Sequence, residues 1–272
     1  MGLCNLICML GILCATFIWR WDSEVRVRAV AVIGFKGSGK TTVASYIVGE
    51  LKRRGLRVAA VKHAHGGISV NDEDSGRLFG AGADRVIAVS DDVVEEYRRS
   101  RASLWEVISQ LRGFDFAVFE GFKSEFPGVR LAVARNVEEA RELLTPLTVA
   151  ITGRVAKEDH SGLPVPVFDL ESEGERLVDF LLEKAFEPLP GLNCGFCRYG
   201  SCVALAEAVA RGEAGHGECT VLSSKVKLLV DGKPVELNPF VQDVFRNVVF
   251  ALVGSLKGVG SSPSRVELRV ER

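Results

Sequence analysis

Residues 34–41 have the sequence Gly-Phe-Lys-Gly-Ser-Gly-Lys-Thr, which fits the pattern G-x-x-x-x-G-K-S/T of a phosphate-binding loop. Its glycines let the backbone curl so that successive N–H groups can point at phosphate oxygens, and the helix expected after it adds a positive N-terminal end. Lys40 is expected to bridge the β- and γ-phosphates, and the Thr41 hydroxyl to coordinate Mg²⁺. The pattern therefore predicts a nucleoside triphosphate site with these contacts: Gly34, Gly37, Ser38, Gly39, Lys40, Thr41 and Thr42.

A carboxylate, Glu120, directly follows the apolar run 116–119. P-loop enzymes place an acid at the end of such a strand, where it holds Mg²⁺ through water or positions a nucleophile. Asp115 lies at the opposite end of the run and is the weaker candidate. We therefore predict that Lys40 and Glu120 are the catalytic residues and that Thr41 and Glu120 hold Mg²⁺. The sequence has no Asn-Lys-x-Asp segment that would recognise guanine, so the residues alone leave GTP and ATP open.

Two histidines, His63 and His65, follow the apolar run 57–62, with Lys62 before them. Ligands collect at the carboxyl ends of strands in open α/β sheets. We expect one or both histidines to contact a substrate, a metal or the triphosphate. Loop histidines without any ligand are the alternative.

Four cysteines have the spacing C-x2-C-x4-C-x16-C: Cys194, Cys197, Cys202 and Cys219. A tight loop that carries three thiolates, and a helix that brings back the fourth, can hold a [4Fe-4S] cluster. Zinc is the main alternative, although zinc sites usually pair two short C-x2-4-C segments. Disulfides or free thiols are the third alternative, and a disulfide would be unusual beside a nucleotide domain of the cytoplasmic type. We predict that the four cysteines are metal ligands and favour the cluster.

The elements that must position these residues follow from apolar periodicity. A strand over 26–33, a helix over 42–54 and a strand over 57–63 give the βαβ unit of a parallel sheet. A helix near 102–112 and a helix over 171–186 are predicted to pack on that sheet. The fold class is therefore α/β, a P-loop NTPase with a mostly parallel, doubly wound sheet over residues 25–188, and its further strands are expected at 85–90, 114–121, 130–134, 147–152 and 165–168.

The C-terminal part is predicted to be a small α+β iron-sulfur module. Residues 189–222 carry the four cysteines, and a helix is expected after Cys202, ending at Gly212. Residues 223–272 are predicted to form a hairpin with an Asp-Gly turn, an amphipathic helix and a last strand at 264–272. We expect the Phe and Val stripe of that helix to pack in the core.

Charge and the N-terminal segment limit the partners. The 34 basic and 35 acidic residues give a net charge of −1, which argues against nucleic acid as a partner. Residues 1–19 carry no charged side chain and are about as long as a membrane-spanning helix. Arginines after them would keep the protein cytoplasmic, with the segment 1–24 as a membrane anchor, an extension upstream of the true start, or a packed helix. Cys4, Cys8 and Cys14 are assigned no ligand role.

Four ordered motifs resemble the molybdopterin-guanine dinucleotide biosynthesis protein B family, MobB: GFKGSGKTT, VKHAHG, DSGRLFGAGADRVIAVS and FAVFEGFK. The resemblance implies a protein that binds GTP, often as a homodimer, and assists the guanylyltransferase that attaches GMP to molybdopterin. It also implies that Gly34 to Thr42 bind phosphate, that His63 and His65 lie in the loop after the second strand, and that Glu120 to Lys123 lie beside the triphosphate. Gly66 departs from the family, which often has a further histidine there.

The segment GLNCGFCRYGSC with the late cysteine resembles the small four-cysteine [4Fe-4S] domain of electron-transfer and corrinoid-protein subunits. Arg198 replaces a glycine that is common after the second cysteine, which would put a charge near the cluster. Together the resemblances imply a GTP-binding adaptor with slow GTPase activity that acts in molybdenum or tungsten cofactor biosynthesis. The alternative is a nucleotide-gated electron-transfer protein or an iron-sulfur carrier.

Overall fold

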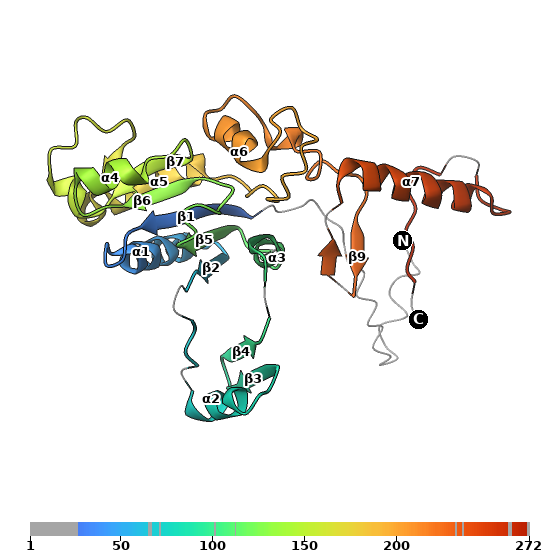
Figure 1. Ribbon diagram of the computed structural model, residues 1–272, viewed down its shortest axis with the longest axis horizontal. Helices are drawn as coiled ribbons and strands as arrows, with labels where there is room; N and C mark the ends of the chain where they lie inside the picture. The colour runs from blue at the N-terminus through green and yellow to red at the C-terminus, as the bar shows by residue number, and fades with distance from the viewer. Residues whose placement is uncertain are drawn as a thin grey trace, which may run out of the picture.

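Six parallel strands form the central sheet in the order β2-β5-β1-β6-β7-β8 (Figure 1). The computed structural model describes residues 27–64, 67–70, 72–100, 102–111, 113–231, 233–235, 237–260 and 263–270. The strands span β1 Arg28–Gly34, β2 Val58–Lys62, β5 Phe116–Glu120, β6 Arg130–Val133, β7 Thr148–Thr152 and β8 Val167–Phe168. All five pairings are parallel, so the carboxyl ends of β1, β2 and β5 meet at one edge. That edge carries the phosphate loop.

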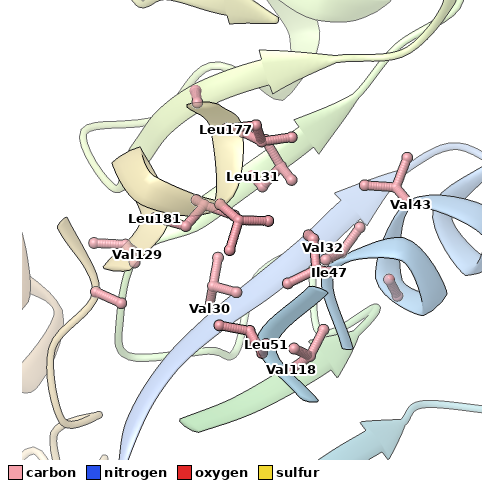
Figure 2. Close-up of a cluster of buried hydrophobic side chains, with 14 of the residues drawn as sticks. Val30, Val32, Val43, Ile47, Leu51, Val118, Val129, Leu131, Leu177 and Leu181 are labelled. Atoms are coloured by element: carbon pink, nitrogen blue, oxygen red, sulfur yellow. The ribbon is translucent and has the colours of Figure 1, made fainter. Parts of the chain in front are cut away.

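Helices cover both faces of this sheet, as the α/β prediction required. Side chains of a strand alternate between faces, and in β1 Val30 and Val32 point to one face while Ala31 and Ile33 point to the other. Helices α1 (Lys40–Arg53) and α5 (Leu170–Lys184) pack on the first face, and α3 (Leu104–Ser109) and α4 (Val137–Leu143) on the second. Figure 2 shows the first face, where Val30 and Val32 lie among Ile47 and Leu51 of α1 and Leu177 and Leu181 of α5. The doubly wound sheet is confirmed.

A charged network ties the end of α1 to α5. The Glu50 side chain is only 7% exposed and accepts hydrogen bonds from Arg53 (2.7 and 2.8 Å) and Arg54 (2.7 Å). Those arginines in turn reach Glu175 and Asp179 of α5. The hydrogen bonds from the two guanidinium groups lower the pKa of Glu50 from 4.5 to about 2.

We expect Glu50→Gln to lower the melting temperature at neutral pH. A carboxylate with a depressed pKa stabilises the fold above its unfolded-state pKa of 4.5, and this stabilisation is lost as the pH falls toward about 2. The melting temperatures of parent and variant should therefore converge between pH 4.5 and pH 2. Thermal unfolding followed by circular dichroism across this range measures the difference. A gap that stays constant with pH would contradict the role of the Glu50 charge.

The prediction that 85–90 joins the main sheet is wrong. Strand β3 (Arg85–Val89) pairs antiparallel with β4 (Val94–Arg98), and with α2 (Glu73–Gly80) they form a unit set apart from the six-stranded sheet (Figure 1). The connection between the two strands is a short turn, closed by Ser90 N–H donating to the Val93 carbonyl. A short turn joins antiparallel neighbours, whereas a parallel sheet needs a long crossover.

The C-terminal part contains helix α6 (Cys202–Ala210), a hairpin of β9 (Leu228–Val230) and β10 (Lys233–Val235), and helix α7 (Pro239–Gly254). Two 3-10 turns complete the elements, Arg154–Lys157 in the nucleotide part and His216–Glu218 after α6. The hairpin and both helices are confirmed. The last strand is not, because residues 263–270 form no strand.

The apolar stripe of α7 is not in a core, contrary to expectation. Phe240 is 67% exposed and Leu252 is 64% exposed, and Val244 and Val248 between them are exposed as well. Helical spacing identifies which side chains share a face. It does not supply the element that would cover that face.

Within the described ranges, no helix is both long and apolar enough to cross a membrane. The expected segment 1–24, with its three cysteines and the membrane contact through 1–19, lies outside those ranges.

Candidate functional site

The phosphate loop joins β1 to α1 and leaves the start of the helix uncapped. Gly37 (φ 77°) and Gly39 (φ 93°) both take left-handed conformations, and Gly39 is the N-cap without a side-chain hydrogen bond to the helix. The six other α-helices in the described part of the chain each have a side-chain cap: Asp72, Ser103, Asn136, Asp169, Ser201 and Asn238. First-turn N–H groups of a helix need an acceptor. At α1 that acceptor can be an anion.

Close packing fixes the shape of the loop. A Cβ on Gly34 would lie 2.5 Å from the Val133 carbonyl oxygen and 2.6 Å from Ser38 Oγ, so only glycine fits there. The Ser38 hydroxyl is buried and has no hydrogen-bond partner among the described residues. A buried hydroxyl without a partner is costly. A phosphate oxygen in the loop would supply one, so the loop fits a phosphate group.

The cation, the hydroxyl and the carboxylate predicted to act together do meet at the edge of the sheet. Thr41 Oγ1 donates to Glu120 Oε1 at 2.8 Å, and Lys62 Nζ lies 3.8 Å from Glu120 Oε2. Lys40 Nζ donates to the Phe35 carbonyl at 2.6 Å. Burial lowers the pKa of Lys40, and the charge of Glu120 partly opposes this. A hydroxyl and a carboxylate in contact beside the loop are oxygen ligands of the kind that Mg²⁺ takes.

The turn after β5 brings the second and fourth family motifs together. Gly121 (φ 97°) and Phe122 (φ 55°) both lie in the left-handed region, and this turn brings the Phe122 ring onto that of His63, with centroids 4.8 Å apart. The next residue, Lys123, holds its Nζ 4.3 Å from the centre of the Phe35 ring in the phosphate loop. His63 and Lys123 therefore flank the loop as expected. His65 lies outside the described residues.

The four cysteines gather in a second place. All four line one narrow pocket, where Cys202 and Cys219 are buried and Cys194 and Cys197 are half-buried. All four are free thiols, and burial raises the pKa of the Cys219 thiol. No three His, Cys, Asp or Glu side chains of the described residues are placed to hold one metal ion.

The loop around the cysteines is shaped by its own polar groups. Asn193 takes a left-handed conformation (φ 46°) and its Oδ1 accepts from the Cys202 N–H at 2.9 Å. Ser201 caps α6, so the third cysteine is the first residue of that helix. Arg198, expected to place a charge near the cluster, forms an ion pair with Glu218 at 2.8 Å. Its charge is therefore partly neutralised.

Comparison with known protein families gives two matches along the chain. Residues 29–153 match the family model "Molybdopterin guanine dinucleotide synthesis protein B". They form a MobB-family domain. Residues 189–221, which contain all four cysteines, match the model "Putative Fe-S cluster". The MobB domain therefore holds the phosphate loop, and the Fe-S domain holds the cysteine pocket.

Relatives carry names of one kind. A "Putative molybdopterin-guanine dinucleotide biosynthesis adapter protein" of Methanocaldococcus jannaschii is 29% identical over 252 residues, which is 90% of this chain and 98% of that protein. A "Probable molybdopterin-guanine dinucleotide biosynthesis adapter protein" of Bacillus subtilis is 28% identical, over 57% of this chain and 91% of its own. The crystal structure of Bacillus subtilis MobB aligns with 58% of this chain and 98% of that chain, at 29% identity and a TM-score of 0.49.

Sequence reasoning missed two basic residues in the MobB domain. Lys62 was noted only as part of the histidine turn, yet its ammonium faces Glu120. Arg130 was counted as a strand residue, yet its guanidinium is buried. A charge inside the apolar run Val-Arg-Leu-Ala-Val-Ala was the available signal for Arg130. Asp115, the weaker acid candidate, instead pairs with Arg57 at 2.9 Å at the other edge of the sheet.

Proposed function

We propose that this protein binds GTP with Mg²⁺ in its MobB domain and acts as an adaptor when a guanine nucleotide is attached to molybdopterin. The names of its relatives support the pathway. The observation that carries the nucleotide site is the loop itself, where an uncapped helix start and the buried Ser38 hydroxyl surround the place for a phosphate. Molybdenum and tungsten forms of the cofactor fit this proposal equally.

In this proposal Lys40 leaves the Phe35 carbonyl and donates to the β- and γ-phosphate oxygens. Thr41 holds Mg²⁺ directly, and Glu120 holds it through water or positions the attacking water. The magnesium ion supplies positive charge that neutralises the triphosphate. Hydrolysis is slow in our proposal, because segments 34–42, 62–64 and 120–124 contain lysines and no arginine to serve as an arginine finger.

The cysteine pocket is proposed to hold a [4Fe-4S] cluster. Four thiolates are the ligand set that such a cluster takes, and all four thiols line the same pocket. When bound, the cluster can exchange one electron, so the Fe-S domain can transfer electrons, sense redox state or stabilise its own fold. A homodimer and a cytoplasmic location remain predictions.

The experiment that tests this function uses anaerobically purified full-length protein. We expect roughly four iron and four acid-labile sulfide per chain, GTP bound more tightly than ATP, and binding that needs Mg²⁺. Glu120→Gln should weaken the Mg²⁺ dependence while leaving iron content unchanged. Binding of the molybdopterin guanylyltransferase, measured with and without GTP, tests the adaptor role. Zinc in place of iron, or a preference for ATP, would overturn the corresponding part.

A second function is favoured by the packing of the cysteine module on the MobB domain. Leu147, just before β7, shares one apolar cluster with Cys202, Leu205 and Cys219. Nucleotide hydrolysis could therefore be coupled to reduction or transfer of the cluster. A cluster whose reduction requires GTP turnover would favour this function, and a cluster indifferent to nucleotide would favour the adaptor.

A further inference from the structure

A cavity of about 450 Å³ lies between the MobB domain and helix α6. Pockets of a few hundred Å³ are of the size that small organic ligands occupy. Lys123, Ser124 and Arg130 line it from the MobB domain, and Val203 and Glu207 line it from α6. The cavity is thus closed by the same helix that begins with Cys202.

Arg130 is the unusual group in this cavity. Its side chain is only 5% exposed, and burial lowers the pKa of its guanidinium. One nitrogen, Nη2, donates to the carbonyl oxygens of Ser124 (3.4 Å) and Phe126 (3.2 Å). Its Nε has no hydrogen-bond partner among the described residues. Buried charges are normally paired, so this guanidinium is short of an acceptor.

The neighbouring groups define what the acceptor can be. Lys123 adds a second cation at the wall of the cavity, and its Nζ also faces the phosphate loop through the Phe35 ring. Glu207 is the only carboxylate in the lining. It raises the pKa of Arg130 by its charge, without forming an ion pair in the described structure. Two cations against one carboxylate leave the site positive, and a guanidinium recognises phosphate in a planar, two-bond geometry.

The rest of the lining is apolar. Leu143, Pro146 and Leu147 form the wall on the MobB side, and Val203 faces them from α6. A free oxyanion would leave this wall without a partner, whereas an organic group would cover it. Apolar walls with a few convergent polar groups are typical of sites for small organic ligands.

We propose that this cavity binds an organic phosphate, with the phosphate against Arg130 and Lys123 and a compact apolar or aromatic group against the wall of leucines. The site is separate from the phosphate loop and goes beyond the proposed GTP binding. Because Lys123 borders both, the two ligands would lie side by side. The guanidinium gives the phosphate a charged partner, and the phosphate gives Nε the acceptor that it lacks.

The test is calorimetric titration of the full, cluster-containing chain with phenyl phosphate, after saturating GDP and Mg²⁺ have occupied the loop. Parent protein should bind phenyl phosphate at least about tenfold more tightly than inorganic phosphate, because only the former covers the apolar wall. Arg130→Met should weaken phenyl phosphate binding at least about tenfold, the loss expected for charge-assisted hydrogen bonds. The GDP affinity of this variant should be unchanged, which separates failure of this site from failure of the proposed function.

Two further variants make the result decisive. Arg135→Met is the matched control, because Arg135 follows the same strand but pairs with Glu139 at the surface, and its phenyl phosphate affinity should equal that of the parent. Glu207→Gln removes the competing carboxylate and should tighten binding about threefold or more. The proposal is overturned if the GDP-saturated parent does not bind phenyl phosphate, or if Arg130→Met binds it as the parent does. Equal affinity for inorganic phosphate would overturn the organic ligand, and if Arg130→Met does not fold, unchanged binding by Glu207→Gln would overturn the site.

Discussion

Replacing Lys40 with alanine is expected to lower GTP affinity about 100-fold, because it removes two charge-assisted hydrogen bonds to phosphate worth roughly 1.5 kcal/mol or more each. The ammonium lies at the start of an uncapped helix, where it already points back over the loop to the Phe35 carbonyl. Isothermal titration with GTP and Mg²⁺ measures the change. The effect should appear in the dissociation constant, with the stoichiometry of parent and variant the same.

The fold itself should tolerate this change. Lys40 is a partly buried cation at the positive end of a helix dipole, which is an unfavourable place for it without a bound anion. Nucleotide-free Lys40→Ala should therefore melt at or above the parent temperature. Lys36→Ala is the matched control, since Lys36 is an exposed residue of the same loop, and we expect its affinity to stay within about threefold of the parent. If Lys36→Ala loses as much affinity as Lys40→Ala, the loop binds phosphate differently from our proposal.

The nucleotide half of the fold could be predicted because its signals are local and dense. Strand β1 is a continuous apolar run that must be covered on both faces, and it leads directly into a loop whose residue types have few other uses. Glu120 could be found for the same reason, since it ends the next fully apolar run. Each of these expectations depends on a stretch of fewer than ten or so residues and on general rules for parallel sheets.

The strand at 85–90 could not be placed from the sequence. Its residues are as apolar as those of a sheet strand, yet Ile87 and Val89 are exposed in the hairpin with β4. Strand propensity reports how well side chains suit a pleated surface and says little about which sheet they join. Strand β4, with the sequence Val-Glu-Glu-Tyr-Arg, was missed because three of its five residues are charged.

The cavity beside Arg130 was also beyond the sequence. Its walls come from three separate segments: the turn after β5, the connection before β7, and helix α6. No spacing rule joins residues 123, 147 and 207. What the sequence did contain was an arginine within an apolar strand, and only the fold determines whether such a residue faces water or is buried. Here it is buried, on the face of the sheet opposite α1 and α5.

Helix α6 connects the two domains in a way that makes the cysteine mutants informative. Its first residue is a predicted cluster ligand, and Val203 and Glu207 of the same helix line the cavity against the MobB domain. Leu205 and Ala206 are fully buried within the apolar cluster that contains Cys202 and Cys219. Losing the metal centre should therefore disturb the packing of α6 first.

Cys202→Ser is expected to reduce bound iron from about four to less than one per chain, because a cluster held by four thiolates loses a ligand at its most buried loop position. The visible absorption of the cluster should disappear, and the cysteine module should unfold at a lower temperature, since metal binding and folding are coupled in such small modules. GTP affinity should remain within about threefold of the parent, because the phosphate loop has its own core. Iron, sulfide and GTP titration on one anaerobic preparation measure all three.

The control for this mutant lies at the other end of the chain. Cys14 belongs to the N-terminal group of three cysteines that we assign no ligand role, so Cys14→Ser should keep the full iron content. If Cys14→Ser loses iron as Cys202→Ser does, the metal site is not the one formed by the four C-terminal cysteines. If Cys202→Ser instead keeps its iron and loses only stability, the thiol serves the packing of α6, and the cluster must be held by other ligands.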